Sequence, residues 1–548
     1  MGLGSYFLGG ATGLGRRLNA VRAHRGLTVA MPDGVHLATD HYAPRSRDPH
    51  PTLLLRVPYG LAGFRAVAEA YAERGFHVVL QACRGTGGSG GEFDPLSHER
   101  DDGLATLAWI RRQPWFDGRI GITGASYLGY ATWAICDALP PGAAICTKVT
   151  SAEFRTVVLP GGTLNLGLLL GWLQTVEGVR RPFTLLARML SGGVERRSWY
   201  ASLRLPLVEL DRRIVGRKVP FWREWLTAAL EPEFWEPLDH SFRLTEATPP
   251  NHFISGWYDF MIDQLLRDYA QLVDRGQRPY LTIGPWTHVS PELQSVGIRE
   301  TVAWMRAHLC GDRSMLREKP VRVFISGRNE WAEFDAFPPA PPDDQIWHLH
   351  PGGVLGQRPS RTSNPDGYRY DPRKPTPSLG GAMFAFSGAG PVDQAPLESR
   401  KDVLTYTSDP LFSDVTIMGG TRVTLYARSS NPNTDYFVRL CDVDPQGRSI
   451  NLADGIVRIT SGHPPAPDDI LKLTIRIHAA AHCFRRDHRI RLQVSSGAHP
   501  RYARNTGTDE PLGSATTLVP ADVEIFHDPA HPSTVILPVY EGERLKLD

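Results

Sequence analysis

The stretch RIGITGASYLG, from Arg119 to Gly129, decides how this chain folds. An apolar run with the composition of a β-strand ends in small residues around Ser126, and residues 130–135 then have the composition of a helix. A serine in such a sharp strand-to-helix turn is expected where its hydroxyl acts as a nucleophile, because small neighbours relieve the strain and the helix N-terminus stabilises negative charge. The second glycine falls one place later than in the usual motif, so the motif alone also fits a glycine-rich turn before a core helix.

Two later segments supply the acid and the base that a nucleophilic serine needs. Residues 251–259, NHFISGWYD, indicate a buried strand that ends at Asp259, and residues 279–288, PYLTIGPWTH, indicate another strand followed by His288. Both side chains would lie past the carboxyl ends of parallel strands, where open α/β sheets place their sites. The order fits one mechanism, in which Asp259 orients His288 and His288 takes the proton of Ser126. The structural alternatives are a helix N-cap for Asp259 and a hydrogen-bonded loop histidine for His288.

Changes in the pattern of the chain predict three domains. The early part alternates strands with helices, which is typical of a mostly parallel sheet, and this pattern returns near residue 246. We therefore predict a catalytic α/β domain from residues 1–148 plus 246–340. Residues 149–245 are helical and rich in Leu, Arg and Trp, and we expect them to form a cap over the serine. Residues 341–548 show short alternating runs between Gly, Pro and Asp turns, which predicts an all-β sandwich.

These segments together resemble a known family, the CocE/NonD-type serine hydrolases. That family includes cocaine esterase, α-amino-acid ester hydrolases, glutaryl acylases and X-Pro dipeptidyl peptidases. The matching segments span nearly the whole chain: residues 113–121, 256–259, 284–288, 434–443 and 488–492. One departure is Asp487, where the family usually has glycine. The resemblance implies an α/β-hydrolase domain with an inserted helical cap and a C-terminal jelly-roll sandwich.

The tetrahedral intermediate of acyl transfer needs two hydrogen-bond donors aimed at its oxygen. One is expected to be the backbone N–H of Tyr127, the residue after the nucleophile. In the family, the second donor is a tyrosine hydroxyl on the loop that follows an early strand. Residues 51–60, PTLLLRVPYG, supply that strand and loop, so the resemblance assigns this role to Tyr59. Without the resemblance, Tyr59 would be interpreted as an ordinary loop aromatic.

The composition is that of a globular protein and argues against several functions. Hydrophobic residues make up 41% and charged residues 22% of the 548 residues, and the net charge of +2 gives no indication of a nucleic-acid partner. The six cysteines are scattered without a C-x-x-C pair, which favours reduced thiols. No apolar run reaches the roughly 18 to 20 residues that a membrane span needs. Residues 1–16 lack the basic region and cleavage site of a signal peptide. We expect a cytoplasmic protein with no membrane partner. The sequence leaves open whether the chain forms a homo-oligomer.

Three patterns imitate cofactor or metal sites. Residues 85–90, GTGGSG, fit G-x-G-x-x-G, but a loop with a proline follows where a dinucleotide-binding helix would begin. His348 and His350 alternate like strand residues, with no third ligand nearby. The last third of the chain contains three acids that could suggest calcium ligands: Asp442, Asp444 and Asp454. We interpret them as ordinary loop and turn carboxylates, which are far commoner than calcium ligands. We predict no metal and no cofactor.

The residues after Asp259 bear on the substrate. In the α-amino-acid ester hydrolases, an acidic pair closely follows the catalytic aspartate. This chain has Met261 and Ile262 at those places, and Asp263 comes one place later. Because an ammonium group would lose its hydration against Met and Ile without gaining a carboxylate, we expect an uncharged acyl group. Core packing is the alternative role for the three residues that we expect to line the pocket: Trp172, Phe260 and Met261.

The sequence thus predicts a serine hydrolase that cleaves carboxylic esters, with amides as a further substrate class, through an acyl-enzyme at Ser126. An X-Pro dipeptidyl peptidase or an acylase is the first alternative. It would require a carboxylate from the cap near the serine, for which Glu153 and Glu177 are the candidates. The second alternative is a non-catalytic protein that binds its partner through the β domain.

Overall fold

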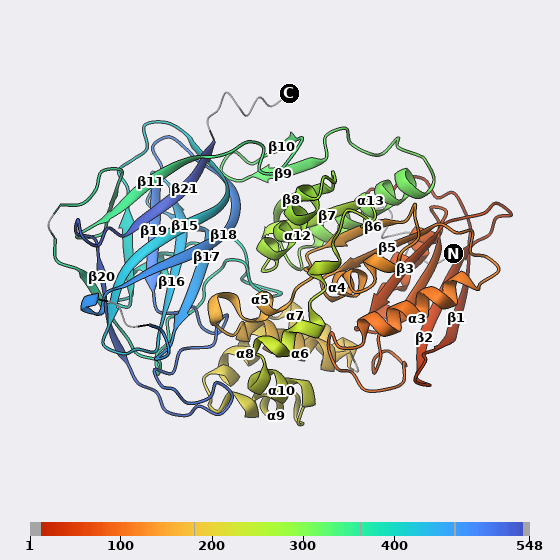
Figure 1. The fold of residues 1–548 in the computed structure, drawn as a ribbon, viewed down its shortest axis with the longest axis horizontal. Helices are drawn as coiled ribbons and strands as arrows, with labels where there is room; N and C mark the ends of the chain where they lie inside the picture. Colours follow the sequence, from red (N-terminus) through yellow and green to blue (C-terminus); the bar gives the residue numbers. More distant parts are fainter. Residues whose placement is uncertain (1–11, 180, 362, 465–466, 541–548) are drawn as a thin grey trace.

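The computed structural model describes residues 12–179, 181–361, 363–464 and 467–540. Figure 1 shows a sheet with covering helices in the red-to-green half, a second sheet in the blue half, and a group of helices that lies against both. In the described part of the chain, we find no helix with both the length and the apolar character needed to cross a membrane.

The first sheet has the strand order β1-β2-β4-β3-β5-β6-β7-β8-β9-β10. Neighbours between β4 and β9 run parallel, and the pairs β1–β2, β2–β4 and β9–β10 run antiparallel. Its central strands are apolar and buried along their length, as expected for a sheet covered on both faces. The strands are β1 (Val21–Ala30), β2 (His36–Pro44), β3 (Thr52–Val57), β4 (His77–Ala82), β5 (Ile120–Ala125), β6 (Ala144–Lys148), β7 (Asn251–Tyr258), β8 (Tyr280–Thr287), β9 (Val321–Ile325) and β10 (Glu330–Phe334).

Helices cover both faces of this sheet. One face packs on α2 (Arg65–Ala72) and α13 (Pro291–Leu309), which share a single hydrophobic core with the strands. The other face packs on α3 (Glu99–Arg111), α4 (Tyr127–Trp133) and α12 (Ile262–Asp274). The carboxyl ends of β5, β7 and β8 therefore lie at one edge, where this class of sheet places its active site.

The segment between β6 and β7 is helical and packs over that edge. Its apolar residues form one core with Tyr127, Tyr130 and Met261, which belong to the first sheet's loops and helices. A cap that shares a core with the loop after the nucleophile is held in place by hydrophobic burial. The helices of this segment are α5 (Arg155–Val158), α6 (Leu166–Gly178), α7 (Pro182–Leu190), α8 (Gly193–Ser202), α9 (Leu210–Val215), α10 (Pro220–Ala228) and α11 (Pro232–Trp235).

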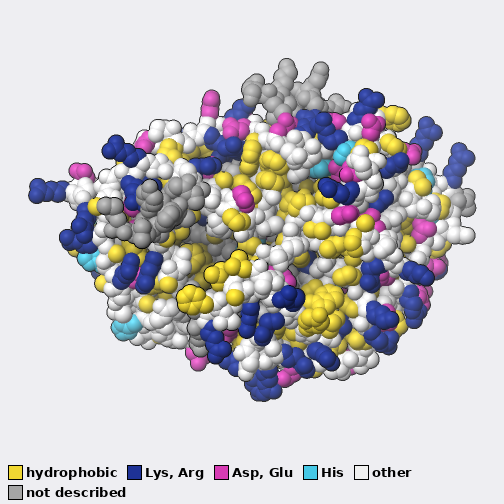
Figure 2. Space-filling view, turned by 180° about the vertical axis from the view of Figure 1, so that it is seen from behind, with side chains coloured by type: hydrophobic (Ala, Val, Ile, Leu, Met, Phe, Trp, Pro, Cys, Tyr) yellow, Lys and Arg dark blue, Asp and Glu magenta, His cyan; other side chains and the backbone are white. Residues whose placement is uncertain are grey.

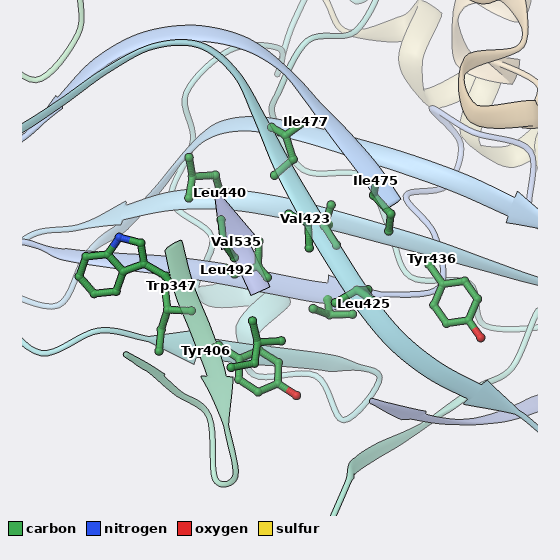
Figure 3. Close-up of a cluster of buried hydrophobic side chains, with 14 of the residues drawn as sticks. Trp347, Tyr406, Val423, Leu425, Tyr436, Leu440, Ile475, Ile477, Leu492 and Val535 are labelled. Atoms are coloured by element: carbon green, nitrogen blue, oxygen red, sulfur yellow. The ribbon is translucent and has the colours of Figure 1, made fainter. Parts of the chain in front are cut away.

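The last third of the chain is a β-sandwich with a large aliphatic and aromatic core. Figure 3 shows part of this core, where side chains such as Trp347, Val423 and Leu425 from different strands meet. One short helix, α14 (Ala395–Glu398), precedes β14. The strands are β11 (Asp343–His350), β12 (Val354–Gly356), β13 (Asp366–Tyr370), β14 (Val403–Thr407), β15 (Val415–Ser429), β16 (Thr434–Val443), β17 (Ser449–Ile459), β18 (Leu471–Phe484), β19 (Arg489–Ser495), β20 (Ala521–Phe526) and β21 (Thr534–Tyr540).

The sandwich is fastened to the rest of the molecule through main-chain contacts. The N–H of Ser326 donates to the carbonyl of Ala481 at 3.0 Å, and the N–H of Cys483 donates to the carbonyl of Ser326 at 2.8 Å. At Gly161 the cap comes so close to β17 that a Cβ atom would lie 1.9 Å from the Ile456 carbonyl oxygen. Acidic and basic side chains are interspersed on the face shown in Figure 2, in keeping with the small net charge.

Candidate active site

Ser126 lies at the turn between β5 and α4 in a strained conformation. Its φ is 57° and its ψ is −124°, in a region that residues with a side chain rarely adopt. Two bonds hold the turn from the neighbouring strand and loop: the Ser126 N–H donates to the Lys148 carbonyl at 2.9 Å, and the Thr150 hydroxyl donates to the Ser126 carbonyl at 2.7 Å. The surrounding structure thus stabilises the strain and presents the hydroxyl beyond the end of the strand.

The glycines around the serine are required by close backbone contacts. A Cβ atom on Gly124 would lie 2.2 Å from the carbonyl oxygen of Leu128, and one on Gly129 would lie 2.5 Å from Cγ2 of Thr150. The unusual position of the second glycine has a local reason, because Gly129 is the residue on which Thr150 packs. The sequence pattern differs from the common motif while the turn keeps its sharp geometry.

Asp259 and His288 form a buried pair at the ends of β7 and β8. His288 Nδ1 lies 2.7 Å from Asp259 Oδ1, and the two side chains are 5% and 0% exposed. The Ser255 hydroxyl donates to the other carboxylate oxygen at 2.9 Å, and the Met261 N–H donates to Oδ1 at 3.3 Å. Because the carboxylate accepts from Nδ1–H, the histidine keeps Nε2 free to accept a proton.

Tyr59 lies next to Ser126 and is held by the cap. The indole Nε1–H of Trp172 donates to the Tyr59 hydroxyl at 3.0 Å. Burial raises the pKa of Tyr59 to about 12, although hydrogen bonds to Trp172 and to the Ser126 side chain oppose the shift. The hydroxyl is therefore neutral at pH 7, and because Trp172 occupies it as an acceptor, its own proton remains available to the site.

Tyr127 has separate roles for its backbone and its side chain. Its N–H belongs to the first turn of α4, where amides have no acceptor within the helix. Its hydroxyl accepts from the Leu96 N–H and donates to Glu99 Oε1, both at 2.9 Å. The ring lies parallel to the indole of Trp172, with centroids 6.1 Å apart.

A small apolar cavity of about 30 Å³ opens beside Ser126. The three residues expected from the sequence all line it, together with residues from the cap and from the last third of the chain. Phe260 connects this cavity to the histidine, because its ring centroid is 4.4 Å from that of His288. The lining consists of Pro95, Leu96, Ser126, Tyr127, Phe154, Leu168, Leu169, Trp172, Trp225, Phe260, Met261 and Phe384.

Phe384 is among the lining residues that sequence reasoning missed, and it comes from the last third of the chain. It lies in the segment between β13 and β14, and its ring packs against His288, with centroids 5.8 Å apart, and against Gly171 of α6. A Cβ atom on Gly171 would lie 2.8 Å from the Phe384 ring. No local pattern marks this contact, since a lone glycine in a cap helix and a distant phenylalanine carry no joint signal.

The acidic residues considered for an ammonium site have other partners. Glu153 accepts from the N–H and hydroxyl of Thr156 and pairs with Arg267 at 3.4 Å. Glu177 forms an ion pair with Arg217. Asp263 accepts from the Ala479 N–H of β18 at 2.9 Å. None of the three carboxylates is among the residues that line the cavity beside Ser126.

The other patterns also have structural partners. Residues 85–91 form a loop after β4 in which the Ser89 hydroxyl accepts from the Ala38 N–H, and the next helix, α3, begins only at Glu99. Asp442 accepts from His482 and His488, and Asp454 pairs with Arg439 and Arg501. Asp444 accepts backbone N–H groups in its own turn, and His350 contacts the Arg358 carbonyl.

Comparison with known proteins places this geometry in context. The family model described as X-Pro dipeptidyl-peptidase (S15 family) matches residues 33–290, and that of the X-Pro dipeptidyl-peptidase C-terminal non-catalytic domain matches residues 315–536. The chain is 32% identical over 571 residues to cocaine esterase from Rhodococcus sp. (strain MB1 Bresler), covering 93% of this chain and 97% of that protein.

Solved structures share the fold over nearly the whole length of this chain. An aminopeptidase from the marine sediment archaeon Thaumarchaeota archaeon matches with a TM-score of 0.80 and 20% identity, over 95% of this chain and 96% of that one. An α-amino acid ester hydrolase matches with a TM-score of 0.74 and 21% identity, over 96% and 98% of the two chains.

Proposed function

We propose that this chain, which belongs to the CocE/NonD-type family of serine hydrolases, cleaves carboxylic esters of small uncharged acyl groups through an acyl-enzyme at Ser126. The observation that supports this most strongly is the buried Asp259–His288 pair, 2.7 Å apart, at the same sheet edge as a serine held at positive φ. Phe260 links the histidine to the serine, since it contacts the His288 ring and lines the same cavity as Ser126.

The proposed reaction has two halves. His288 Nε2 takes the proton of Ser126 as the hydroxyl oxygen attacks the ester carbonyl, and it then gives that proton to the departing alcohol. Water next attacks the acyl-enzyme with His288 again as the base, which releases the acid and restores the serine. Asp259 keeps the histidine oriented and stabilises the imidazolium that forms twice in each cycle.

Two donors would stabilise the tetrahedral intermediates. The Tyr127 N–H lies in the first turn of helix α4, where it has no acceptor within the helix. The Tyr59 hydroxyl accepts from Trp172 and is hydrogen-bonded to the Ser126 side chain, so its proton lies beside the reacting group. Because Trp172 fixes the Tyr59 oxygen and Tyr127 is buried, the two donors would need little reorganisation as negative charge develops.

The character of the cavity favours an uncharged acyl group. Its lining is aliphatic and aromatic apart from Ser126 and the Tyr127 hydroxyl, and it includes no charged side chain. A free ammonium group would be desolvated there without a counter-charge.

A peptidase or acylase acting on amides is the second candidate, because the S15 family model is described as X-Pro dipeptidyl-peptidase. Amides have the poorer leaving group and depend more on the acid step of His288. In this chain Glu153 and Glu177 are paired with Arg267 and Arg217, which leaves no free carboxylate among them for a substrate ammonium group.

The test compares the hydrolysis of p-nitrophenyl acetate, butyrate and octanoate with that of proline and phenylglycine p-nitroanilides. Wild-type protein should hydrolyse the esters, and Ser126→Ala should lose this activity and its labelling by a fluorophosphonate. Turnover of the anilides in place of the esters would support the peptidase. Equal labelling of wild type and Ser126→Ala would show that Ser126 is not the nucleophile.

A further inference from the structure

Beside the Tyr127 hydroxyl lies a buried ion pair that the proposed reaction does not use. Nη1 of Arg56 on β3 lies 2.8 Å from Oε2 of Glu99, the first residue of α3, and the two side chains are 2% and 4% exposed. Nη1 also donates to the Glu99 carbonyl at 2.6 Å, and Nε donates to Gln81 of β4 at 3.2 Å. Charges this deeply buried are held in one geometry, because any displacement would leave them unpaired.

The same ion pair is bonded to the residue after the nucleophile. The second oxygen of Glu99 accepts the hydroxyl proton of Tyr127 at 2.9 Å, and the Leu96 N–H donates to that hydroxyl at 2.9 Å. The Tyr127 side chain is therefore fixed at its far end. Because Tyr127 directly follows the strained Ser126, anchoring its side chain also restricts the direction of its backbone N–H.

The arginine of the ion pair is close in sequence to Tyr59, the second proposed oxyanion donor. Arg56 stands three residues before Tyr59, and Val57 and Pro58 between them leave little freedom, since Pro fixes its own φ and restricts the residue before it. Tyr59 is then fixed at its hydroxyl by Trp172. A single buried pair thus joins the backbone segments that bear both donors.

We propose that Arg56, Glu99 and the Tyr127 hydroxyl form a positioning network that holds the two oxyanion donors at a fixed separation. These groups act through Tyr127 and Tyr59, so they are positioning residues. The proposal rests on the acyl-transfer function proposed above, and it adds that the alignment of the donors depends on a polar network behind the site.

The first variant is Tyr127→Phe, which removes the hydroxyl and keeps the ring. Its matched control is Tyr130→Phe on the same helix, where a buried hydroxyl donates to the Leu238 carbonyl at 2.9 Å and lies 3.4 Å from the Leu96 carbonyl, without a bond to Glu99. For p-nitrophenyl butyrate, Tyr127→Phe should lower kcat about 10- to 30-fold and leave KM nearly unchanged, because oxyanion stabilisation acts only in the transition state. Tyr130→Phe should stay within about twofold of wild type.

Rates are expressed per active site titrated with a fluorophosphonate, so that misfolded protein does not count. A boronic acid that forms a tetrahedral adduct with Ser126 gives a second readout. Its Kd should rise in Tyr127→Phe by about the same factor by which kcat falls. A residue that only stabilises the fold would lower Tm and leave both quantities unchanged.

Glu99→Gln keeps the shape of the side chain and weakens both of its contacts, the ion pair with Arg56 and the hydrogen bond from Tyr127. It should lower kcat more than Tyr127→Phe does, and the double variant should lose no more than Glu99→Gln alone, because both changes break the same link. Unchanged kcat per titrated site in Tyr127→Phe, or an equal loss in Tyr130→Phe, would overturn the network. If wild type were not titrated at all, the proposed function itself would fail, which is a different result.

Discussion

At the scale of single residues, the strain at Ser126 is stabilised by neighbours that have no room for a larger side chain. Gly129→Ala should destabilise the protein by about 1–3 kcal/mol, because the new Cβ would collide with Thr150, which also bonds the Ser126 carbonyl. The measurement is Tm together with kcat for p-nitrophenyl butyrate. Gly63→Ala is the control, since a Cβ there would have no heavy atom within 4 Å. A wild-type Tm for Gly129→Ala would contradict the steric argument.

The aspartate of the proposed triad is expected to act through the histidine tautomer. Asp259→Asn keeps the shape and the bonds from Ser255 and Met261, but it no longer favours the tautomer with a proton on Nδ1. We expect kcat to fall by about 10⁴-fold with little change in KM. Steady-state ester kinetics measure this, with Asp263→Asn as a control that should retain wild-type rates. A loss of less than about tenfold would remove Asp259 from the triad.

Sequence reasoning finds residues whose chemistry is tied to local position, and it misses those joined only in space. Ser126, Asp259 and His288 each follow a predicted strand, so their proximity could be inferred from the properties of parallel sheets. The hydrogen bond from Trp172 to Tyr59 joins residues 113 positions apart. Trp172 was expected only as a pocket residue, because no spacing rule relates a cap helix to the loop after β3.

At the scale of elements, the pocket wall combines the cap helix α6 with the segment between β13 and β14. Phe384→Ala should lengthen the pocket and raise the ratio of kcat/KM for octanoate over acetate by about tenfold, since changes of this size in an apolar pocket are worth about 1–3 kcal/mol. The p-nitrophenyl ester series measures this ratio. Phe386→Ala is the matched control, because Phe386 packs on Phe384 at 5.4 Å and does not line the cavity. An unchanged ratio would place Phe384 outside the acyl site.

Elements of the sheet follow from the sequence more directly than those of the cap. Runs such as residues 53–57 and 120–123 were expected as strands because they are apolar and bounded by turn residues, and they lie in β3 and β5. In the cap, α6 is apolar on most of its surface because it packs against the serine loop, the other cap helices and the Phe384 segment together. Periodicity cannot distinguish such a helix from any other buried segment. The sequence therefore predicted its place in the cap and the pocket role of Trp172, and its contact with Phe384 came from the structure.

At the scale of the whole molecule, a buried carboxyl makes stability depend on pH. Burial raises the pKa of Asp268 on α12 to about 8, although a hydrogen bond from the Ala152 N–H opposes the shift. The folded state therefore keeps a proton that the unfolded state loses above its ordinary pKa near 3.8. Between these two values the unfolded state binds fewer protons, so stability falls as pH rises, by up to about 1.4 kcal/mol per pH unit.

Asp268→Asn should remove this dependence, because the amide can still accept from Ala152 and does not titrate. We expect its Tm to exceed that of wild type by a margin that grows from pH 5 to pH 8 and then levels off. Thermal melts across this range measure the difference. Asp528→Asn is the control and should show no such growing margin. Desolvation opposes the shift, but the pKa of Asp528 is lowered because its carboxylate accepts hydrogen bonds from backbone N–H groups and from the His531 side chain. Parallel Tm curves for wild type and Asp268→Asn would contradict the prediction.

The way the sandwich closes sets an order in which the parts of a newly made chain can fold. Strand β11 pairs with β21, so the sandwich lacks a partner strand until nearly two hundred further residues have left the ribosome, while the first sheet is complete at β10. Domains fold as units during synthesis, with N-terminal ones first. The serine, aspartate and histidine of the proposed triad can thus be in place before β11 has its partner strand β21. Translation of β21 therefore completes the sandwich only after the sheet that bears the proposed triad has been made.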